Sequence, residues 1–348
     1  MRRVSRIAVA GVASAALALS VSACGGTSAD ASGSGKSKGI GIAYDVGGRG
    51  DQSFNDAATA GMERAKKEFK YKGTAVEPKD GESDADKTQR LISLAKQGYN
   101  PVIGVGYAYA PAVKEASEKF PKVTFGIVDD ATIKAKNVAS LVFSEQEASY
   151  LAGVAAAKAT KSKNVGFVGG VDVPLIHKFE AGFAQGVKDT DPKIKVQRQY
   201  LTETAAEGGF TSPDKGKAAA EAQIEKGADV VYHAAGLSGQ GVIEAAAKSK
   251  NWAIGVDSDQ YEQKPLAAYK EYILTSATKD VAKAVFNLAK SVQDGKPTTG
   301  VVRGDLKSGE VALSDSNPKF AKDTAIQEAV KKAEEGIVNG DIKVKDKP

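Results

Sequence analysis

The sequence has few of the residues that build common catalytic and metal sites. Its 348 residues include one cysteine and two histidines. Cys24 has no partner for an intramolecular disulfide. His177 and His233 are far apart, and no HExxH motif or cysteine pair accompanies them, which gives a zinc site no support. The sequence also lacks a GxSxG nucleophile elbow, and its glycine pairs lack the Lys-Ser/Thr of a P-loop. We therefore expect neither an enzyme nor a cofactor.

The sequence also lacks a charge bias of one sign. Its formal net charge is +5, and Arg2, Arg3 and Arg6 supply three of the positive charges. In the rest of the chain lysines alternate with acidic residues and form no basic stripe. This distribution predicts no nucleic-acid partner.

The first 23 residues are typical of a secretory signal peptide. A basic start is followed by the apolar run Ile7 to Leu19, which is too short to act as a stop-transfer span. The stretch Val21-Ser22-Ala23-Cys24 resembles a bacterial lipobox, which implies cleavage before Cys24 and lipidation of that cysteine; the alternative is a chance cysteine near an ordinary cleavage site. Residues 24–38 are rich in Gly and Ser and predict a flexible tether. We expect a protein anchored by lipid to the extracytoplasmic face of the cell membrane.

From residue 39 onward, short apolar runs alternate with amphipathic segments. This alternation predicts α/β structure, with parallel sheets covered by helices on both faces. The pattern restarts near residue 164 and predicts two doubly wound, Rossmann-like lobes. We assign 39–142 plus 273–296 to the N-terminal lobe and 143–272 plus 297–348 to the C-terminal lobe. A chain that crosses repeatedly between two lobes leaves a hinge cleft, a typical place for a small-molecule site.

The segment Asp51–Asn55 joins the first apolar run to the first predicted helix. Ser53 is expected to cap that helix, with Asp56 as the acid of a capping box. Phe54 and Asn55 then lie in the first helical turn, beyond the carboxyl end of a strand, where open parallel sheets bind ligands. An aromatic face beside an amide suits a heterocyclic ligand. The alternative, equally favoured by position alone, is that Phe54 belongs to the core.

Other polar and aromatic residues follow the remaining strands. In the first lobe these residues are Tyr107, Asp129 and Asp130, and in the second they are Phe210, Gly236 and Asp257. A single Asp in a loop is more often a turn residue. Together, however, these groups can meet only if the carboxyl edges of both sheets form one binding face.

Several segments resemble the basic membrane protein lipoproteins, the BMP or PnrA-like family of ABC-transporter substrate-binding proteins. The similarity covers essentially the whole chain after the tether. The segments that carry it are 48–55, 104–107, 125–129, 166–170, 179–183, 210–217, 233–236, 255–260 and 275–279.

The resemblance implies a type I periplasmic-binding-protein fold with a three-crossover hinge. It also implies a purine nucleoside ligand, with an ABC permease and ATPase as partners. The expected protein is a monomer. By this resemblance Phe54 and Phe210 stack on the two faces of the base, and Asn55 with Asp129 or Asp130 binds the base edge. Asp257 and Lys279 hold the ribose hydroxyls, helped by the backbone near Gly236.

Two positions depart from the family pattern near the expected pocket. Tyr107 stands where the family often has Phe, and Leu237 stands where Gly or Thr is common. Both bear on which nucleoside binds. Phe179 could supply the second aromatic face instead of Phe210, although its place in an amphipathic helix favours the core. A ligand-sensing lipoprotein with the same fold is the alternative to a transport protein.

Overall fold

The computed structural model describes residues 37–79 and 81–348. The predicted signal peptide, Cys24 and nearly all of the predicted tether lie outside these residues. Ser37 and Lys38, which we placed in the tether, already bond to the first lobe. The Ser37 hydroxyl donates to the carbonyl of Asn100 (2.6 Å), and the Lys72 amide donates to the carbonyl of Lys38 (3.1 Å). The folded chain thus includes two residues more than predicted.

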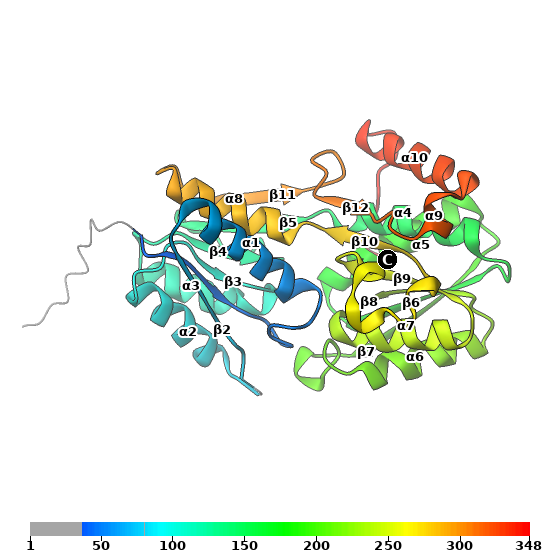
Figure 1. Cartoon of the computed structure of the whole chain (residues 1–348), viewed down its shortest axis with the longest axis horizontal. Coiled ribbons are helices and arrows are strands. Elements are labelled where there is room, and N and C mark those ends of the chain that lie inside the picture. The colour runs from blue at the N-terminus through cyan, green and yellow to red at the C-terminus, as the bar shows by residue number, and fades with distance from the viewer. Residues whose placement is uncertain (1–36, 80) are drawn as a thin grey trace, which may run out of the picture. The chain divides into compact units, whose positions relative to one another are not determined.

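The first lobe is built on six parallel strands in the order β2-β1-β3-β4-β5-β11. Helices α1 and α8 pack together on one face, and α2 and α3 pack together on the other (Figure 1). The elements are β1 (Gly39–Ala43), α1 (Phe54–Phe69), β2 (Lys72–Val76), α2 (Asp84–Lys96), β3 (Val102–Gly104), α3 (Ala110–Lys119), β4 (Phe125–Val128), β5 (Val138–Phe143), α8 (Val281–Gln293) and β11 (Gly300–Gly304).

The second lobe repeats this plan in the order β7-β6-β8-β9-β10-β12, with only β12 antiparallel to its neighbour. Helices α4 and α5 pack together, as do α6 and α7, and α10 lies on α4. The elements are α4 (Glu145–Ala159), β6 (Asn164–Val171), α5 (Pro174–Thr190), β7 (Lys195–Thr202), α6 (Pro213–Glu225), β8 (Val230–Ala234), α7 (Gly239–Lys248), β9 (Trp252–Asp257), β10 (Ile273–Lys279), β12 (Val311–Leu313), α9 (Pro318–Ala321) and α10 (Thr324–Val338).

The two sheets are internal repeats of one topology. The order β2-β1-β3-β4-β5 in the first corresponds to β7-β6-β8-β9-β10 in the second. The prediction of two doubly wound α/β lobes is confirmed. Asp129 follows β4 and Asp257 ends the equivalent strand β9, so the repeat places one aspartate at the same edge of each sheet.

The assignment of the last strands to lobes needs correction. We expected 273–296 in the first lobe and 297–348 in the second. Instead β10 pairs with β9 in the second sheet, through Ala277 and Val256, and β11 pairs with β5 in the first, through Val302 and Leu141. A short apolar run indicates a strand, but not which of two similar sheets it joins.

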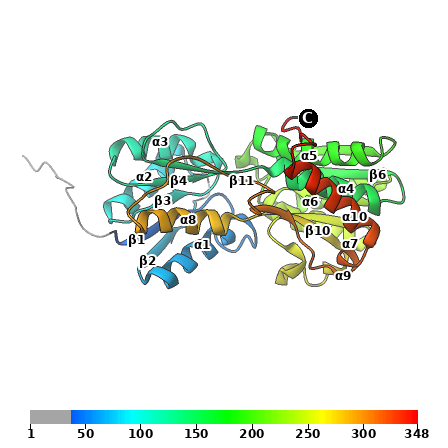
Figure 2. The same cartoon turned by 90° about the horizontal axis from the view of Figure 1, so that it is seen from above.

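The chain passes between the sheets three times within residues 81–348, after β5, after β10 and after β11. These segments bond to one another, so they form one hinge, which can be followed in Figure 2. The Ser144 amide donates to the carbonyl of Gly304 (2.8 Å), and the Asp280 amide donates to that of Glu310 (2.8 Å). Among the helices of the described ranges, none combines the length and apolarity needed to cross a bilayer.

The core of the second lobe contains a histidine that is sealed from solvent. The Nε2 atom of His233 lies 2.8 Å from Oε1 of Gln260, and that oxygen also accepts from the Val256 amide (2.9 Å). An amide oxygen only accepts, so Nε2 carries the proton. Nδ1 is left bare, without a partner among the described residues. Burial lowers the pKa of His233 to about 4.

We expect His233 to make stability depend on pH. In the unfolded chain the histidine pKa is about 6.5. The native state therefore binds fewer protons, and its stability is lost as the pH falls from that value towards 4. Denaturant titration of the wild type and His233→Gln should show a loss larger by about 2 kcal/mol in the wild type between pH 7 and pH 5. Equal losses in the two proteins would contradict this assignment.

Candidate functional site

A cavity of about 650 Å³, counted with its opening to solvent, is lined by residues of both lobes. Nine predicted site residues line it: Asp51, Phe54, Asn55, Tyr107, Asp129, Phe210, Gly236, Asp257 and Lys279. Asp130 is not in the lining. Its carboxylate instead accepts from the amide (2.9 Å) and hydroxyl (2.7 Å) of Thr132, so it closes a local turn.

Asp51 shapes the turn that leads into α1. Its carboxylate accepts backbone N–H bonds from Ser53 (2.9 Å), Asn55 (2.8 Å) and Asp56 (3.1 Å). The prediction that Ser53 caps this helix was wrong, because its side chain makes no cap bond. The carboxylate of Asp51 satisfies the helical donors instead, since its two oxygens accept more bonds than one hydroxyl. The Ser53 hydroxyl donates to Asp257 of the other lobe (3.2 Å).

Asn55 is buried, and its amide is engaged within the first lobe. Its Oδ1 accepts from the Asp45 amide (3.0 Å), while Nδ2 donates to Asp51 (3.1 Å) and to the carbonyl of Val46 (3.4 Å). The Asn55 amide, which we expected to bind the edge of a base, therefore stabilises the turn before α1. The consequence is that the neighbouring Phe54 is positioned in the cavity wall.

Lys279 joins the two lobes inside the cavity. Its Nζ lies 2.5 Å from Oδ2 of Asp129 in the first lobe and 3.7 Å from Oδ1 of Asp257 in the second. Burial alone would lower the pKa of Lys279, but the carboxylates of Asp129, Asp257 and Glu145 raise it above its ordinary value. The ammonium also lies 4.7 Å from the ring centroid of Phe54, within cation–π range. Lys279 is thus a permanent positive charge at the hinge.

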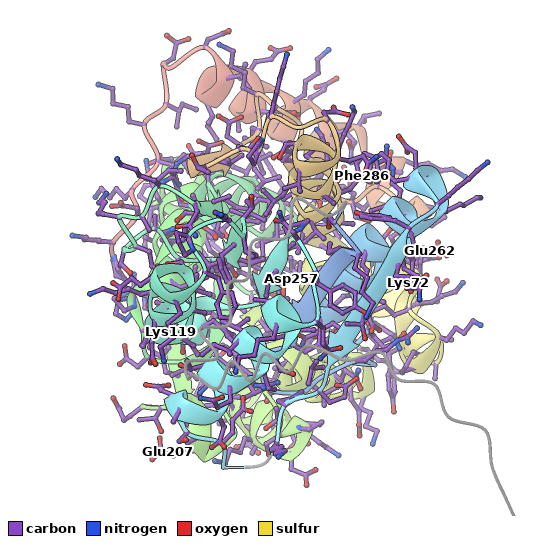
Figure 3. The ribbon with its side chains drawn as sticks, turned by 90° about the vertical axis from the view of Figure 1, so that its left-hand side faces the viewer. Lys72, Lys119, Glu207, Asp257, Glu262 and Phe286 are labelled. Atoms are coloured by element: carbon purple, nitrogen blue, oxygen red, sulfur yellow. The ribbon has the colours of Figure 1, made fainter. Side chains whose placement is uncertain are left out.

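Both aspartates that face Lys279 have left-handed backbones, with φ of 67° at Asp129 and 65° at Asp257. Asp tolerates this region better than most residues, but such strain concentrates at functional sites. Burial raises the pKa of Asp257. Oδ1 of Asp129 is buried and has no hydrogen-bond partner among the described residues. It is an unused acceptor on the cavity wall. Figure 3 labels Asp257 among central side chains, whereas the labelled Lys119 and Glu207 are exposed.

Asp45 follows β1, as Asp129 follows β4, and it also lines the cavity. Burial raises the pKa of Asp45 to about 7, and burial together with Asp45 raises that of Tyr107 to about 12. A Cβ on Gly106 would lie 2.1 Å from the Asp45 carboxylate. Position 106 therefore requires glycine, because a side chain there would collide with the Asp45 carboxyl group in the cavity wall.

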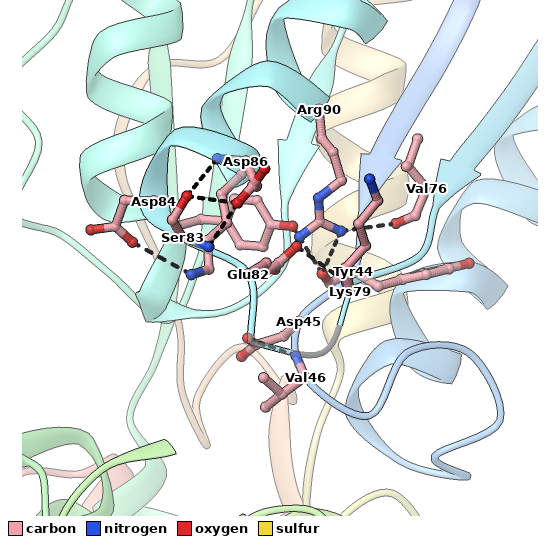
Figure 4. A network of polar contacts seen from close by, with 12 residues as sticks. Tyr44, Asp45, Val46, Val76, Lys79, Glu82, Ser83, Asp84, Asp86 and Arg90 are labelled. Atoms are coloured by element: carbon pink, nitrogen blue, oxygen red, sulfur yellow. Dashed lines mark hydrogen bonds and ion pairs between the residues drawn. The ribbon is translucent and has the colours of Figure 1, made fainter. Parts of the chain in front are cut away.

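A polar network holds the strand end that carries Asp45 (Figure 4). The Arg90 guanidinium donates to the carbonyls of Tyr44 and Val76, each at 3.5 Å, and pairs with the buried carboxylate of Glu82. The Tyr109 hydroxyl also donates to the Tyr44 carbonyl (2.9 Å). Since Tyr44 directly follows β1 and Val76 ends β2, Arg90 fixes the edge from which Asp45 projects.

The apolar part of the cavity wall comes from both lobes. The ring of Phe210 lies against Gly170 at the end of β6, where a Cβ would be 2.5 Å from a ring carbon. Helix α5 adds Leu175, Ile176 and Phe179. Phe179 is buried, as its helical spacing predicted, and it also lines the cavity. Spacing alone could not show that the buried face of α5 ends at a cavity.

Two α/β lobes around a cavity with polar and aromatic walls are the architecture of a solute-binding protein. A solved ABC-transporter solute-binding protein from Aeropyrum pernix shares this fold with a TM-score of 0.75 and 26% identity, over 87% of this chain and 92% of that one. One from Conexibacter woesei has a TM-score of 0.68 at 21% identity, over 88% and 98%, which supports the fold alone. The expected type I periplasmic-binding-protein fold is confirmed.

The chain belongs to the Bmp family of PnrA-like ABC-transporter substrate-binding proteins, whose model matches residues 40–348. It is 38% identical over 323 residues to the ABC transporter nucleoside-binding protein BmpA of Lactococcus lactis, covering 88% of each chain. It is 32% identical to basic membrane protein A1 of Borrelia garinii, covering 78% of this chain and 77% of that one. The family resemblance predicted from the sequence is therefore confirmed.

We expect Lys279→Met to destabilise the protein strongly. Removing one partner of a buried ion pair costs roughly 3–5 kcal/mol, because the remaining carboxylates lose their counter-ion. The loss should shrink at low pH, where Asp257, whose pKa is raised by burial, can protonate. Denaturant titration across pH measures both effects. The control is Lys319→Met, which removes an exposed pair with Glu271 (3.0 Å) and should cost at most about 1 kcal/mol. Equal costs would contradict the bridging role of Lys279.

Proposed function

We propose that this protein captures a purine nucleoside in the cavity between its lobes and delivers it to an ABC permease. The observation that carries the proposal is the composition of the wall. Aromatic rings from both lobes line the same cavity as the buried, unused oxygen of Asp129. A flat base with a hydroxylated sugar needs both kinds of surface. A relative whose name states nucleoside binding supports the same ligand class.

Phe54 and Phe210 would hold the base. They come from opposite lobes, at the start of α1 and just before α6, so a base between them would contact both lobes. Stacking on one aromatic ring contributes about 1–3 kcal/mol per base. Asp45 and Tyr107 line the first-lobe part of the cavity and would read the base edge. With its pKa near 7, Asp45 can donate a hydrogen bond when protonated and accept one when ionised.

Asp129, Asp257 and Lys279 would hold the sugar. Lys279 contacts both carboxylates, so these three groups serve the same end of a ligand. Carboxylates accept strong, charge-assisted bonds from vicinal hydroxyls, and the ammonium donates to hydroxyl oxygens. We therefore assign Asp129 to the ribose, whereas the sequence suggested the base edge. Gly236, with φ of 54°, would present its backbone beside Phe210.

The remaining proposals concern the location of the protein in the cell, its oligomeric state and its partners. We propose that lipidated Cys24 anchors the protein to the extracytoplasmic face of the cell membrane, and that the protein acts as a monomer. A permease and an ATPase are the partners, and the protein itself binds without catalysing a reaction. The sensing alternative has no observation of the described residues in its favour.

Isothermal titration of the purified protein with adenosine, guanosine, inosine and pyrimidine nucleosides tests the proposal directly. We expect at least one purine nucleoside to bind in the micromolar range or tighter, because stacking and the charged sugar contacts add together. Mass spectrometry of any co-purifying small molecule should identify the same compound. Absence of binding to every nucleoside at sub-millimolar concentrations would refute the proposal.

Phe54→Ala and Phe210→Ala should each weaken nucleoside binding by about tenfold or more, since each removes one stacking face worth about 1–3 kcal/mol. The matched control is Phe69→Ala. Phe69 lies at the other end of α1, stacks on Phe286 at 5.5 Å, and is not in the cavity lining. This control should lower the melting temperature and leave affinity unchanged. If Phe54→Ala lowers the melting temperature as Phe69→Ala does and still binds, Phe54 is a core residue.

A further inference from the structure

The two lobes are also joined by hydrogen bonds outside the cavity. In the first lobe the contact is the backbone carbonyl of Gln52, and in the second it is the side chains of Ser258 and Gln263. The Gln263 amide donates to the Gln52 carbonyl, and the Ser258 hydroxyl donates to that same carbonyl at 3.2 Å. The Gln263 amide also donates to the Ser258 hydroxyl at 2.8 Å. None of these three residues lines the cavity.

The donors in this triangle all have partners. The Gln263 NH₂ group has two protons, and both are used. The Ser258 hydroxyl accepts one bond and donates one, while the Gln52 carbonyl uses both of its lone pairs. The donors of the triangle are thus engaged, while Oε1 of Gln263 is buried and has no partner among the described residues. We name these three groups the closure latch.

The first-lobe half of the latch is preorganised. Gln52 has a left-handed backbone, with φ of 55°. Its N–H donates to the Asp56 carboxylate (3.1 Å), and Asp51 binds the N–H of Ser53 directly after it (2.9 Å). These bonds remain within the first lobe. The direction of the Gln52 carbonyl therefore does not depend on the second lobe. The latch forms when closure brings Ser258 and Gln263 to this carbonyl.

The position of the latch relates it to ligand binding. Ser53 follows Gln52 and donates across the cleft to Asp257, whose neighbour Ser258 belongs to the latch. Phe54 and Asp257, which line the cavity, are thus adjacent in sequence to groups that hold the lobes together. Opening the lobes would break the two bonds to the Gln52 carbonyl and leave Gln263, which is only 8% exposed, facing solvent.

We infer that the closure latch of Gln52, Ser258 and Gln263 sets ligand affinity without contacting the ligand. Its two bonds to the Gln52 carbonyl exist only when the lobes are closed, so they raise the population of the closed state. Apparent affinity scales with the fraction of the protein that is competent to bind. Gln263 is in this sense a positioning residue for the nucleoside site, and this inference rests on the proposed function.

The test compares Gln263→Glu with a matched control. The substitution keeps the shape of the side chain but removes both donors and sets a carboxylate against the Gln52 carbonyl. Gln327→Glu is the control, because the Gln327 amide also donates to a backbone carbonyl, that of Phe320 (3.0 Å), but within the second lobe. Ser258→Ala is a second, milder latch variant. Each protein is measured by nucleoside titration, dissociation kinetics, thermal melting and small-angle scattering without ligand.

We expect Gln263→Glu to weaken nucleoside affinity about tenfold, mainly through faster dissociation, since the interlobe bond from Gln263 is lost and a carboxylate then faces the Gln52 carbonyl. Its ligand-free radius of gyration should exceed that of the wild type, while Gln327→Glu matches the wild type in both respects. Affinity and radius unchanged by Gln263→Glu and Ser258→Ala would overturn the latch. So would losses that equal those of the control. If the wild type binds no nucleoside, the proposed function fails, and the scattering comparison alone decides the latch.

Discussion

The buried contact of Lys279 with two carboxylates is the interaction on which the site depends. Burying three charged groups is costly, and their mutual attraction must offset that cost. Asp129 comes from one sheet and Asp257 from the other, and Lys279 projects from the hinge between them. The cost is offset only while the two sheet edges face each other. The electrostatics of the site and the closed arrangement of the lobes are therefore one physical problem.

The repeated topology explains why two carboxylates are available to one lysine. Strands β4 and β9 are equivalent in the two sheets, and each is followed or ended by an aspartate with a left-handed backbone. The carboxyl ends of parallel strands meet at one sheet edge, where ligands bind in open α/β folds. When two such edges face each other, the equivalent aspartates converge. The hinge lysine is the group that the repeat alone does not supply.

Some residues around the cavity stabilise the surrounding backbone, and others keep polar atoms or aromatic surface available to a ligand. Asp51 and Asn55 direct their polar atoms to the backbone of one turn. Asp129 keeps one carboxylate oxygen without a partner among the described residues. Phe54 and Phe210 present aromatic surface that protein atoms do not fully cover. This division gives a physical reason to expect the ligand at the available groups and the affinity to depend on the others through geometry.

The sequence by itself determined the α/β alternation, the restart of the pattern in a second lobe, and the placement of polar residues after strands. These are local properties, set by apolar periodicity and by turn residues. Only the tertiary structure decided that β10 joins the second sheet and β11 the first, because the two sheets share one strand order and a short strand-like run fits either. It also decided that Asp51 caps α1, that Asp130 closes a local turn with Thr132, and that Gln263 bonds to Gln52, 211 positions away in the sequence. Such contacts depend on how two lobes meet, and no local pattern carries that information.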